Sequence, residues 1–491
     1  MSVATKSRSS TLWLLAILGL YVAIGVQYAA LTPAWQVPDE PAHYNYIRHI
    51  ATTSTLPVLQ AGDYDQAYLS ELTSTGFPPD RSVDSLRYEG HQPPLYYLLA
   101  APVYLVTGGA LLPLRLVSLA LGAGVVLLTY HTMRELFPGT PALALSAAGF
   151  VAFLPQHVAM MAGVNNDSLA ELVIAATLWT TIVWLRPQAG HGNTGNTRTA
   201  SRYELPIAPY VLLVGLLVGA AFVTKATAYV VAPTVATAVW LRGRREAWEA
   251  KRYDRAFASI FGPALIIGAL WWGRNLAVYG WPDFLGLIRH DQIVVGQPRT
   301  AEWLALYDGP EFARRFAQTT FQSFWGQFGW MGVPMDSRIY WTLLAFSLLI
   351  LAGLAYTARP WIFRDADAAA EPPDRPAGTI PQPTGRDSGR ALTRTRLAPQ
   401  QRDGLTVLLI CLALTIALYL YYNIGLVQHQ GRYLFPALIP ISLGVAIGLS
   451  GCADIAPTAI RRWLPLGAIG LLAALDLIAL YRFIVPALPN F

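Results

Sequence analysis

The amino-acid sequence predicts an all-α polytopic membrane protein. Of its 491 residues, 54% are apolar and 13% are charged, whereas charged residues make up about a quarter of ordinary soluble domains. Apolar runs long enough to cross a bilayer core as a helix recur along the whole chain. The net charge of +6 comes from short basic clusters between these runs, a pattern that indicates membrane orientation and argues against nucleic-acid binding.

Eleven apolar runs have spanning length, and we expect each to form one transmembrane helix. In chain order they occupy residues 11–31, 111–130, 141–161, 168–185, 206–223, 226–241, 256–273, 339–357, 404–423, 433–450 and 463–485. The first run follows Lys6 and Arg8 and is longer than a signal-peptide core, so we interpret it as an uncleaved anchor.

The basic residues determine the expected orientation. With the N-terminus in the cytoplasm, 22 of the 35 basic residues fall in cytoplasmic loops, as the positive-inside rule requires. Residues 93–106 are apolar but too short to span, and Pro102 interrupts them. If they did span, Arg242, Arg244 and Arg245 would lie outside, so we expect this segment to lie flat in the membrane interface.

This topology divides the chain into three parts. Residues 1–358 would form a transmembrane module with long outer loops at 32–92 and 274–338. Residues 359–403 are rich in Pro, Arg, Asp and Gly, so they predict a disordered cytoplasmic linker. Residues 404–491 would add the last transmembrane helices.

Six polar clusters border or interrupt the apolar runs, and the predicted topology places all of them at the outer face. They contain Asp39 with Glu40, His91, Asn166 with Asp167, Lys225, Arg274, and Gln430 with Arg432. Because segments far apart in the chain would converge there, we expect a functional site at this face.

The acidic residues of these clusters allow two interpretations. Asp39 and Glu40 stand between two prolines, and a carboxylate pair held in this way suits a general base or a divalent cation. Asp39 could equally cap a helix that begins near Glu40. Asp167 could likewise cap the fourth span, where it shares a helix face with Glu171.

The basic and amide residues are also open to two interpretations. Lys225 interrupts an apolar stretch, so it needs an anionic partner or must extend to the interface. Arg274 and Arg432 could be ordinary basic residues at the ends of spans. Gln430 and its neighbours have the hydrogen-bonding capacity that sugar hydroxyls need, but could also form a solvated turn.

At these residues the sequence resembles the GT-C superfamily of integral-membrane glycosyltransferases, with a layout similar to protein O-mannosyltransferases and lipid A aminoarabinose transferases. The similar segments are PDEPAHYNYIRHI, PPLYYLLAAPVYLV, VNNDSLAELV and TKATAYVVAP, all within about the first 280 residues. The resemblance implies two juxtamembrane helices in the first outer loop, at 40–50 and 93–106. It also implies that Asp39 is an essential acidic residue with Glu40 beside it, that Asp167 is a second one, and that Lys225 lies near a lipid phosphate.

The resemblance implies inverting transfer of a sugar from a polyprenyl-phosphate donor to an acceptor hydroxyl on the outer face. Asp39 would be the general base. Lys225, with Arg274 or Arg432, would neutralise the donor phosphate. His91, Asn166 and Gln430 are further candidates for donor binding because the predicted topology places them at the same face. The partners would be the lipid bilayer, the lipid-linked sugar and a glycan, lipid or protein acceptor. The sequence identifies no cofactor: Asp39, Glu40 and Asp167 could hold a divalent metal ion, or Glu40 and Asp167 could position the acceptor.

Three other classes of protein remain open. A polysaccharide polymerase or ligase would also use a lipid-linked donor but would transfer whole chains. A multi-span transporter has a similar number of helices, although Asp476 is the clearest acidic residue deep in a span and the other candidate residues cluster at one face. A non-catalytic scaffold needs none of the residues named above.

Overall fold

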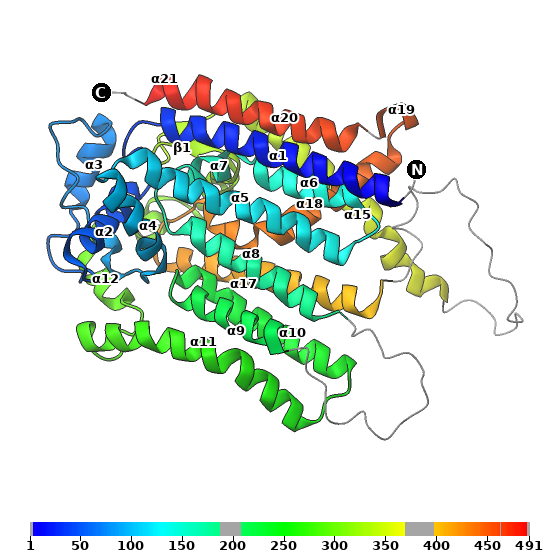
Figure 1. The fold of residues 1–491 in the computed structure, drawn as a ribbon. Helices are drawn as coiled ribbons and strands as arrows, with labels where there is room; N and C mark the ends of the chain where they lie inside the picture. The colour runs from blue at the N-terminus through cyan, green and yellow to red at the C-terminus, as the bar shows by residue number, and fades with distance from the viewer. Residues whose placement is uncertain (1–2, 187–207, 369–396, 462, 489–491) are drawn as a thin grey trace, which may run out of the picture.

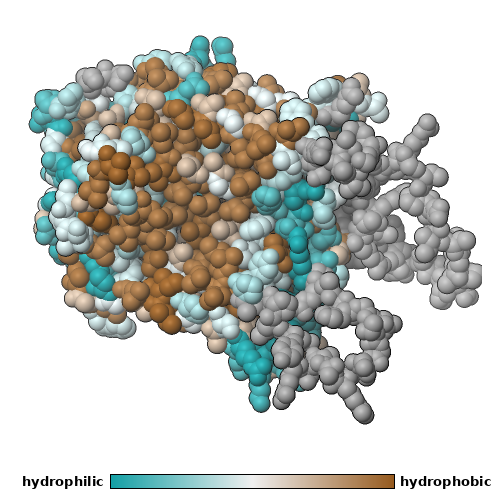
Figure 2. Space-filling view, in the orientation of Figure 1, coloured by the Kyte–Doolittle hydropathy of each residue, from teal (hydrophilic) through white to brown (hydrophobic). Residues whose placement is uncertain are grey.

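The computed structural model describes residues 3–186, 208–368, 397–461 and 463–488. These residues form a bundle of helices that run side by side along one axis (Figure 1). Apolar side chains cover the middle of the bundle, and hydrophilic ones gather toward its two ends (Figure 2). This belt is what a helix bundle shows when lipid surrounds its middle and water its ends. The predicted all-α polytopic membrane fold is therefore confirmed.

Within the described residues, eight helical segments are long and apolar enough to cross a membrane, and a bent pair of helices makes a ninth. The eight segments contain α1 (Val3–Leu31), α5 (Leu111–Leu136), α8 (Asp167–Trp184), α11 (Ala250–Tyr279), α15 (Ser337–Ala368), α17 (Pro399–Gly425), α18 (Leu438–Ile455) and α20 (Leu464–Ile478). The bent pair is α6 (Pro141–Ala152) and α7 (Pro155–Met161), which meet at 62°. Pro155 begins α7, and a proline cannot continue the hydrogen bonding of a preceding helix. Nine of the eleven predicted runs thus correspond to these segments.

The other two runs form shorter helices. They are α9 (Ala208–Phe222) and α10 (Val231–Arg245), with Lys225 and the 3-10 turn η2 (Ala226–Val230) between them. Each has 15 residues, or about 22 Å at 1.5 Å per residue, less than the thickness of a bilayer core. α9 packs against α8 and α11, and α10 packs against α17, so both belong to the bundle.

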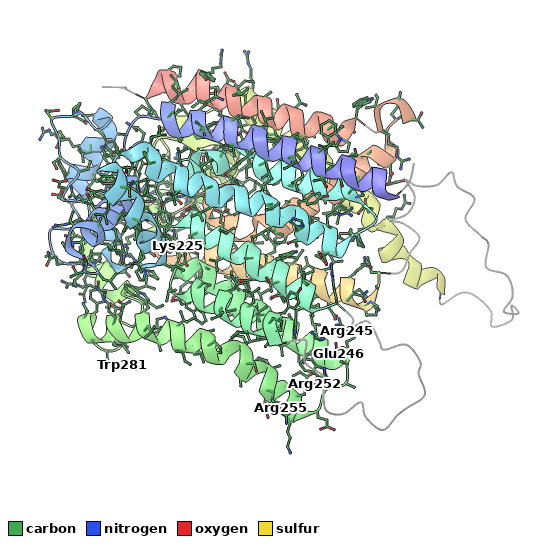
Figure 3. All side chains as sticks on the ribbon, viewed as in Figure 1. Lys225, Arg245, Glu246, Arg252, Arg255 and Trp281 are labelled. Atoms are coloured by element: carbon green, nitrogen blue, oxygen red, sulfur yellow. The ribbon has the colours of Figure 1, made fainter. Side chains whose placement is uncertain are left out.

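The helices alternate in direction, and the two chain termini lie at opposite ends of the bundle (Figure 1). Lys225 and Trp281 lie toward one end, while Arg245, Arg252 and Arg255 lie toward the other (Figure 3). This separation agrees with the predicted topology, in which the turn at Lys225 and the basic loop after residue 241 face opposite sides. We call the end that carries Lys225 the site end.

Short elements of two long loops cover the site end. The first loop supplies α2 (Glu40–Thr53), α3 (Gln66–Thr75), η1 (Tyr88–His91) and α4 (Leu95–Thr107). The second supplies α12 (Leu287–Ile293), α13 (Thr300–Leu306), α14 (Gly309–Trp325) and an antiparallel pair of two-residue strands, β1 (Gln327–Phe328) and β2 (Val333–Pro334). The segment predicted to lie in the interface is α4, which packs on α2 and has 13 residues, too few to span.

The remaining short elements lie in the C-terminal part. They are η3 (Gly431–Ala437), α19 (Thr458–Arg461), η4 (Ala479–Ile484) and α21 (Val485–Ala487). Both ends of the predicted linker 359–403 are helical, because α15 runs to Ala368 and α17 starts at Pro399. Residues 369–396, which make up the rest of that linker, lie outside the described residues.

Candidate active site

Asp39 stands at the start of α2 but does not cap it with its side chain. Its backbone has φ 66° and ψ −2°, the left-handed conformation, and its carboxylate makes no capping hydrogen bond. This conformation is uncommon for a residue other than glycine and costs about 1 kcal/mol. The carboxylate instead accepts hydrogen bonds from the Tyr88 hydroxyl at 2.9 Å and from Nη2 of Arg432 at 2.8 Å. The capping interpretation is therefore wrong for the Asp39 side chain.

The neighbouring Glu40 points into the protein. It is fully buried, and its two oxygens accept hydrogen bonds from Nε and Nη2 of Arg115 at 2.8 and 2.6 Å. The backbone N–H groups of Trp35 and Val164 donate two more. Arg115 also donates to backbone carbonyls at the end of α1. This network ties α1, α2 and α5 together and leaves Glu40 outside the cavity that Asp39 lines.

Asp167 and Lys225 form a second ion pair at the site end. Nζ of Lys225 lies 2.6 Å from Oδ1 of Asp167, and both side chains are mostly buried. The N-cap residue of α8 is Asn166, and Asp167 is the first residue inside the helix. Both charges lie close enough to His43 to act on its pKa. Lys225 thus has the anionic partner that a cation in an apolar stretch needs.

A cavity of about 220 Å³ opens beside Asp39, and we call it the site cavity. Polar and aromatic side chains from both long loops and from η3 line it. They include Asp39, Tyr88, Glu89, His290, Gln430 and Arg432. Clefts lined by a few converging polar groups are the usual places for small substrates to bind.

Two carboxyl groups of the site cavity differ in acidity. Burial alone would raise the pKa of Asp39, but the charge of Arg432 and the hydrogen bonds from Arg432 and Tyr88 keep that pKa below its usual value. Burial and the nearby charge of Asp39 raise the pKa of Glu89 to about 7. Neighbouring carboxyl groups with separated pKa values are typical of sites that handle protons.

His43 lies one helical turn after Asp39, on α2. Burial, together with the charge of Lys225, lowers the pKa of His43 to about 3. Its Nδ1 lies 2.9 Å from the Tyr97 hydroxyl of α4. His43 is thus neutral at physiological pH, and its contact with Tyr97 links α2 to α4.

The remaining predicted residues have different surroundings. Gln430 donates from Nε2 to Gln428 at 2.9 Å and lines the site cavity. The side-chain amide of Asn166 donates a hydrogen bond to Oε1 of Gln92. The ring of His91 packs against the ring of His290, with 4.5 Å between the ring centroids. Neither Asn166 nor His91 lines the site cavity.

Arg274 is directed away from the site cavity. Its guanidinium donates to the backbone carbonyl of Pro57 and stacks on the rings of Trp271 and Tyr279. Arg274 therefore holds the first loop against α11, and it does not line the cavity.

A metal site would need several free ligands. Among the residues that the structure describes, no group of three His, Cys, Asp or Glu side chains is arranged to hold a metal ion. Of the three predicted ligands, Glu40 is bound to Arg115, Asp39 to Arg432 and Asp167 to Lys225. The donor set present therefore does not fit a divalent cation.

Residues 91–192 match the model of the dolichyl-phosphate-mannose-protein mannosyltransferase family. The predicted resemblance to the GT-C glycosyltransferases is confirmed. The segment that matches this glycosyltransferase family runs from His91 through α4 to α8 and includes Asn166 and Asp167. A search of curated protein sequences finds no relative of the chain.

Three solved structures are similar to this chain. The oligosaccharyltransferase of Archaeoglobus fulgidus has 15% identity and a TM-score of 0.46 over 94% of this chain and 52% of that one. ArnT of Cupriavidus metallidurans, bound to undecaprenyl phosphate, has 14% identity and a TM-score of 0.45 over 97% and 74%. The Pmt1-Pmt2 complex of S. cerevisiae, bound to its sugar donor, has 15% identity and a TM-score of 0.37 over 55% and 34%. The chain thus spans about half the length of the oligosaccharyltransferase.

Sequence reasoning missed several residues of the site. Arg115, the partner of Glu40, is a single arginine in an apolar run, so the reasoning applied to Lys225 could have found it. Glu89 and Tyr88 belong to no recognisable motif, and only the fold of the first loop brings them to Asp39.

Proposed function

We propose that this protein is a membrane glycosyltransferase that moves a sugar from a polyprenyl-phosphate donor to an acceptor hydroxyl, with inversion at the anomeric carbon. Two findings support this proposal. The family matched by residues 91–192 is named for a lipid-phosphate sugar donor. Two ion pairs, Arg432 with Asp39 and Lys225 with Asp167, also lie at the site end, where a donor phosphate at the membrane surface would lie. The positive-inside rule favours an extracytoplasmic site end.

The observation that carries the proposal is the position of Asp39. Its carboxylate lines the site cavity, is 27% exposed, and is held by Tyr88 and Arg432 without serving as a helix cap. A carboxylate has about four lone-pair sites, so two hydrogen bonds leave room for a third. Asp39 can therefore accept a proton from a substrate in the cavity.

We propose that Asp39 removes the proton of the acceptor hydroxyl as its oxygen attacks the anomeric carbon. The bond between that carbon and the phosphate oxygen breaks, and polyprenyl phosphate leaves with the bonding electrons. General base catalysis of this kind contributes about 10²- to 10⁴-fold to a rate. Arg432 and Lys225 would stabilise the leaving phosphate, arginine through its planar fork and lysine as a point charge.

Arg432 links phosphate binding to the base. In the structure its guanidinium pairs with Asp39 and lowers the pKa of that carboxyl. A donor phosphate would compete with Asp39 for the guanidinium, because both are anions. As Arg432 turns toward the phosphate, the pKa of Asp39 would rise and the carboxylate would become a stronger base.

The other two predicted catalytic carboxylates receive different roles. We assign Glu40 a structural role, because four hydrogen bonds occupy its buried carboxylate. We assign Asp167 the role of holding Lys225 in place until the donor phosphate binds, because the two charges lie 2.6 Å apart. No step of this reaction requires a metal ion.

The experiment that tests the proposal follows label from the donor. Membrane vesicles containing the full chain are incubated with polyprenyl-phosphate-[¹⁴C]mannose, and the label that leaves the lipid donor and enters an acceptor fraction is measured. We expect transfer with the wild-type chain, and a product whose anomeric configuration is opposite to that of the donor. Absence of any transfer from mannosyl, glucosyl and other neutral glycosyl donors would contradict the proposal.

A further inference from the structure

Three polar atoms in the lining of the site cavity have no hydrogen-bond partner. Oε2 of Glu89, Oε1 of Gln430 and Nε of Arg432 are enclosed by protein, and none of them contacts a donor or acceptor among the described residues. Enclosed polar groups without partners are rare in folded proteins, because each loses its hydrogen bonds to water. Because Glu89, Gln430 and Arg432 all line the site cavity, a small rotation of each side chain would let a molecule bound there supply the missing partners.

The chemistry of the unpaired atoms restricts the ligand. The oxygens of Glu89 and Gln430 are acceptors, so they need ligand groups that donate hydrogen bonds. The oxygens of an ionised phosphate only accept, and the donor phosphate alone therefore cannot satisfy them. Hydroxyl groups both donate and accept, which also suits Nε of Arg432.

Aromatic rings complete the lining. Trp330, Tyr422 and Tyr433 line the same cavity. Their flat apolar faces can cover the C–H face of a sugar ring while the polar groups contact its hydroxyls. The lining therefore fits a compact molecule that has many hydroxyl groups.

The charges of the cavity oppose an acidic sugar. Glu89 and Asp39 both line it, and each acts on the pKa of the neighbouring groups as a negative charge. Arg432 is paired with Asp39, so its charge is already opposed. The charge of Glu89 would repel a carboxylate on the sugar.

We propose that Glu89 determines substrate specificity: it accepts a hydrogen bond from a hydroxyl of an uncharged sugar in the site cavity and excludes sugars that carry a carboxylate. This inference rests on the proposed function and names the class of sugar that the same site uses. Gln430 accepts a second hydroxyl, and Arg432 contacts both the sugar and the phosphate.

The pKa of Glu89 agrees with this role. Burial and the charge of Asp39 raise that pKa to about 7, Asp167 also raises it, and Lys225 and His290 lower it. Glu89 is therefore largely ionised above neutrality, and the carboxylate is the stronger acceptor of a hydroxyl hydrogen bond.

Competition binding with the detergent-solubilised full chain tests the inference. Radiolabelled polyprenyl phosphate is displaced at pH 8 by three ligands: unlabelled polyprenyl phosphate, the same lipid carrying mannose, and the same lipid carrying glucuronic acid. The variant is Glu89→Gln, which keeps the size of the side chain and removes its charge. The matched control is Glu71→Gln, a carboxyl of the same loop that is exposed and paired with Arg81.

For the wild type and Glu71→Gln, we expect the mannosyl lipid to bind about tenfold more tightly than the bare lipid, the size of effect that a hydrogen bond to a charged group supports. The glucuronyl lipid should bind no more tightly than the bare lipid. In Glu89→Gln, we expect the gain from mannose to fall by at least threefold, and the glucuronyl lipid to gain more affinity than the bare lipid, which carries no sugar.

Different failures have different meanings. A Glu89→Gln variant with the wild-type preference among the three lipids would overturn the inference alone. Equal loss of affinity for all three lipids in this variant would also overturn it, because Glu89 would then only support the fold. If the wild-type chain does not bind bare polyprenyl phosphate, the proposed function fails, and the inference with it.

Discussion

Arg432 donates a 2.8 Å hydrogen bond from Nη2 to Oδ2 of Asp39, although 393 positions separate the two residues in the sequence. Arg432 lies in η3, at the start of the segment that continues into α18, and Asp39 lies in the first loop. The C-terminal helices therefore complete the site that the first loop begins. A chain that ended before residue 431 would lack the cation that pairs with Asp39.

Replacing Arg432 tests the link between phosphate binding and the base. We expect Arg432→Ala to weaken binding of polyprenyl phosphate by about tenfold or more, because a charge-assisted hydrogen bond is lost. Arg432→Lys keeps the charge but not the planar fork, so its affinity should lie between those of Arg432→Ala and the wild type. Direct binding of radiolabelled polyprenyl phosphate measures both. Wild-type affinity in Arg432→Ala would remove Arg432 from the phosphate site.

Alanine variants of Lys225 and Arg274 should differ in their KM for the lipid donor, although the sequence predicts phosphate binding for both residues. Lys225→Ala should raise the KM for the lipid donor by about tenfold, because a point charge near the phosphate is lost. Arg274→Ala should leave that KM within about twofold, because Arg274 contacts Pro57 and the rings of Trp271 and Tyr279. Its effect should be a lower Tm. Steady-state kinetics with varied donor, and melting in detergent, separate the two; equal changes in KM would contradict these assignments.

The sequence alone predicts most of the architecture and the end at which the polar clusters meet. Because successive membrane spans run in opposite directions, each polar turn between them is assigned to one face of the membrane without any knowledge of packing. Lys225 was predictable in the same way, because a cation in an apolar stretch requires a partner.

Side-chain pairing could not be predicted in this way. Asp39 and Glu40 are adjacent and chemically alike, yet the left-handed backbone of Asp39 sends one carboxylate to the cavity and the other to Arg115. Arg274 has the same sequence signature as Arg432 but faces Pro57. Contacts between segments decide these outcomes, and a single sequence does not contain them in readable form.

The Glu40–Arg115 pair should contribute to stability and little to chemistry. Glu40→Ala leaves the buried charge of Arg115 without its partner, which costs about 3 to 5 kcal/mol. The double variant Glu40→Gln/Arg115→Met replaces the ion pair with neutral groups and should recover much of that loss. Denaturant unfolding in detergent, followed by tryptophan fluorescence, measures both. If Glu40→Ala is as stable as the wild type but inactive, Glu40 has a catalytic role instead.

Glu89 should make stability depend on pH. Its pKa of about 7 lies above the usual value of 4.5, so its contribution is fully present below pH 4.5 and is lost as the pH rises through 7. Asp39 acts in the opposite direction, since its lowered pKa adds stability that is lost only in acid. The pKa of His43 is about 3 in the folded chain, below its usual value of 6.5, so His43 destabilises the folded state in acid and this penalty is relieved as the pH rises through 6.5.

Between pH 5 and 8 we therefore expect the Tm of the wild type to fall relative to the Tm of Glu89→Gln as the pH rises, because the contribution of His43 is common to both proteins. Melting curves of the two proteins across this range provide the measurement. If the Tm of the two proteins changes with pH in the same way, the surroundings of Glu89 do not raise its pKa.

The central claim is that Asp39 removes the proton of the acceptor, and the single-turnover rate of sugar transfer tests it most directly. Vesicles preloaded with polyprenyl-phosphate-[¹⁴C]mannose are compared for the wild type, Asp39→Asn and Asp65→Asn, a control in the same loop that makes the same chemical change at a residue capping α3. We predict that Asp39→Asn binds the donor at least as tightly as the wild type, because the phosphate no longer competes with a carboxylate for Arg432, and loses 10²- to 10⁴-fold in rate, while the control keeps its rate. A rate for Asp39→Asn within about threefold of the wild type would contradict the claim.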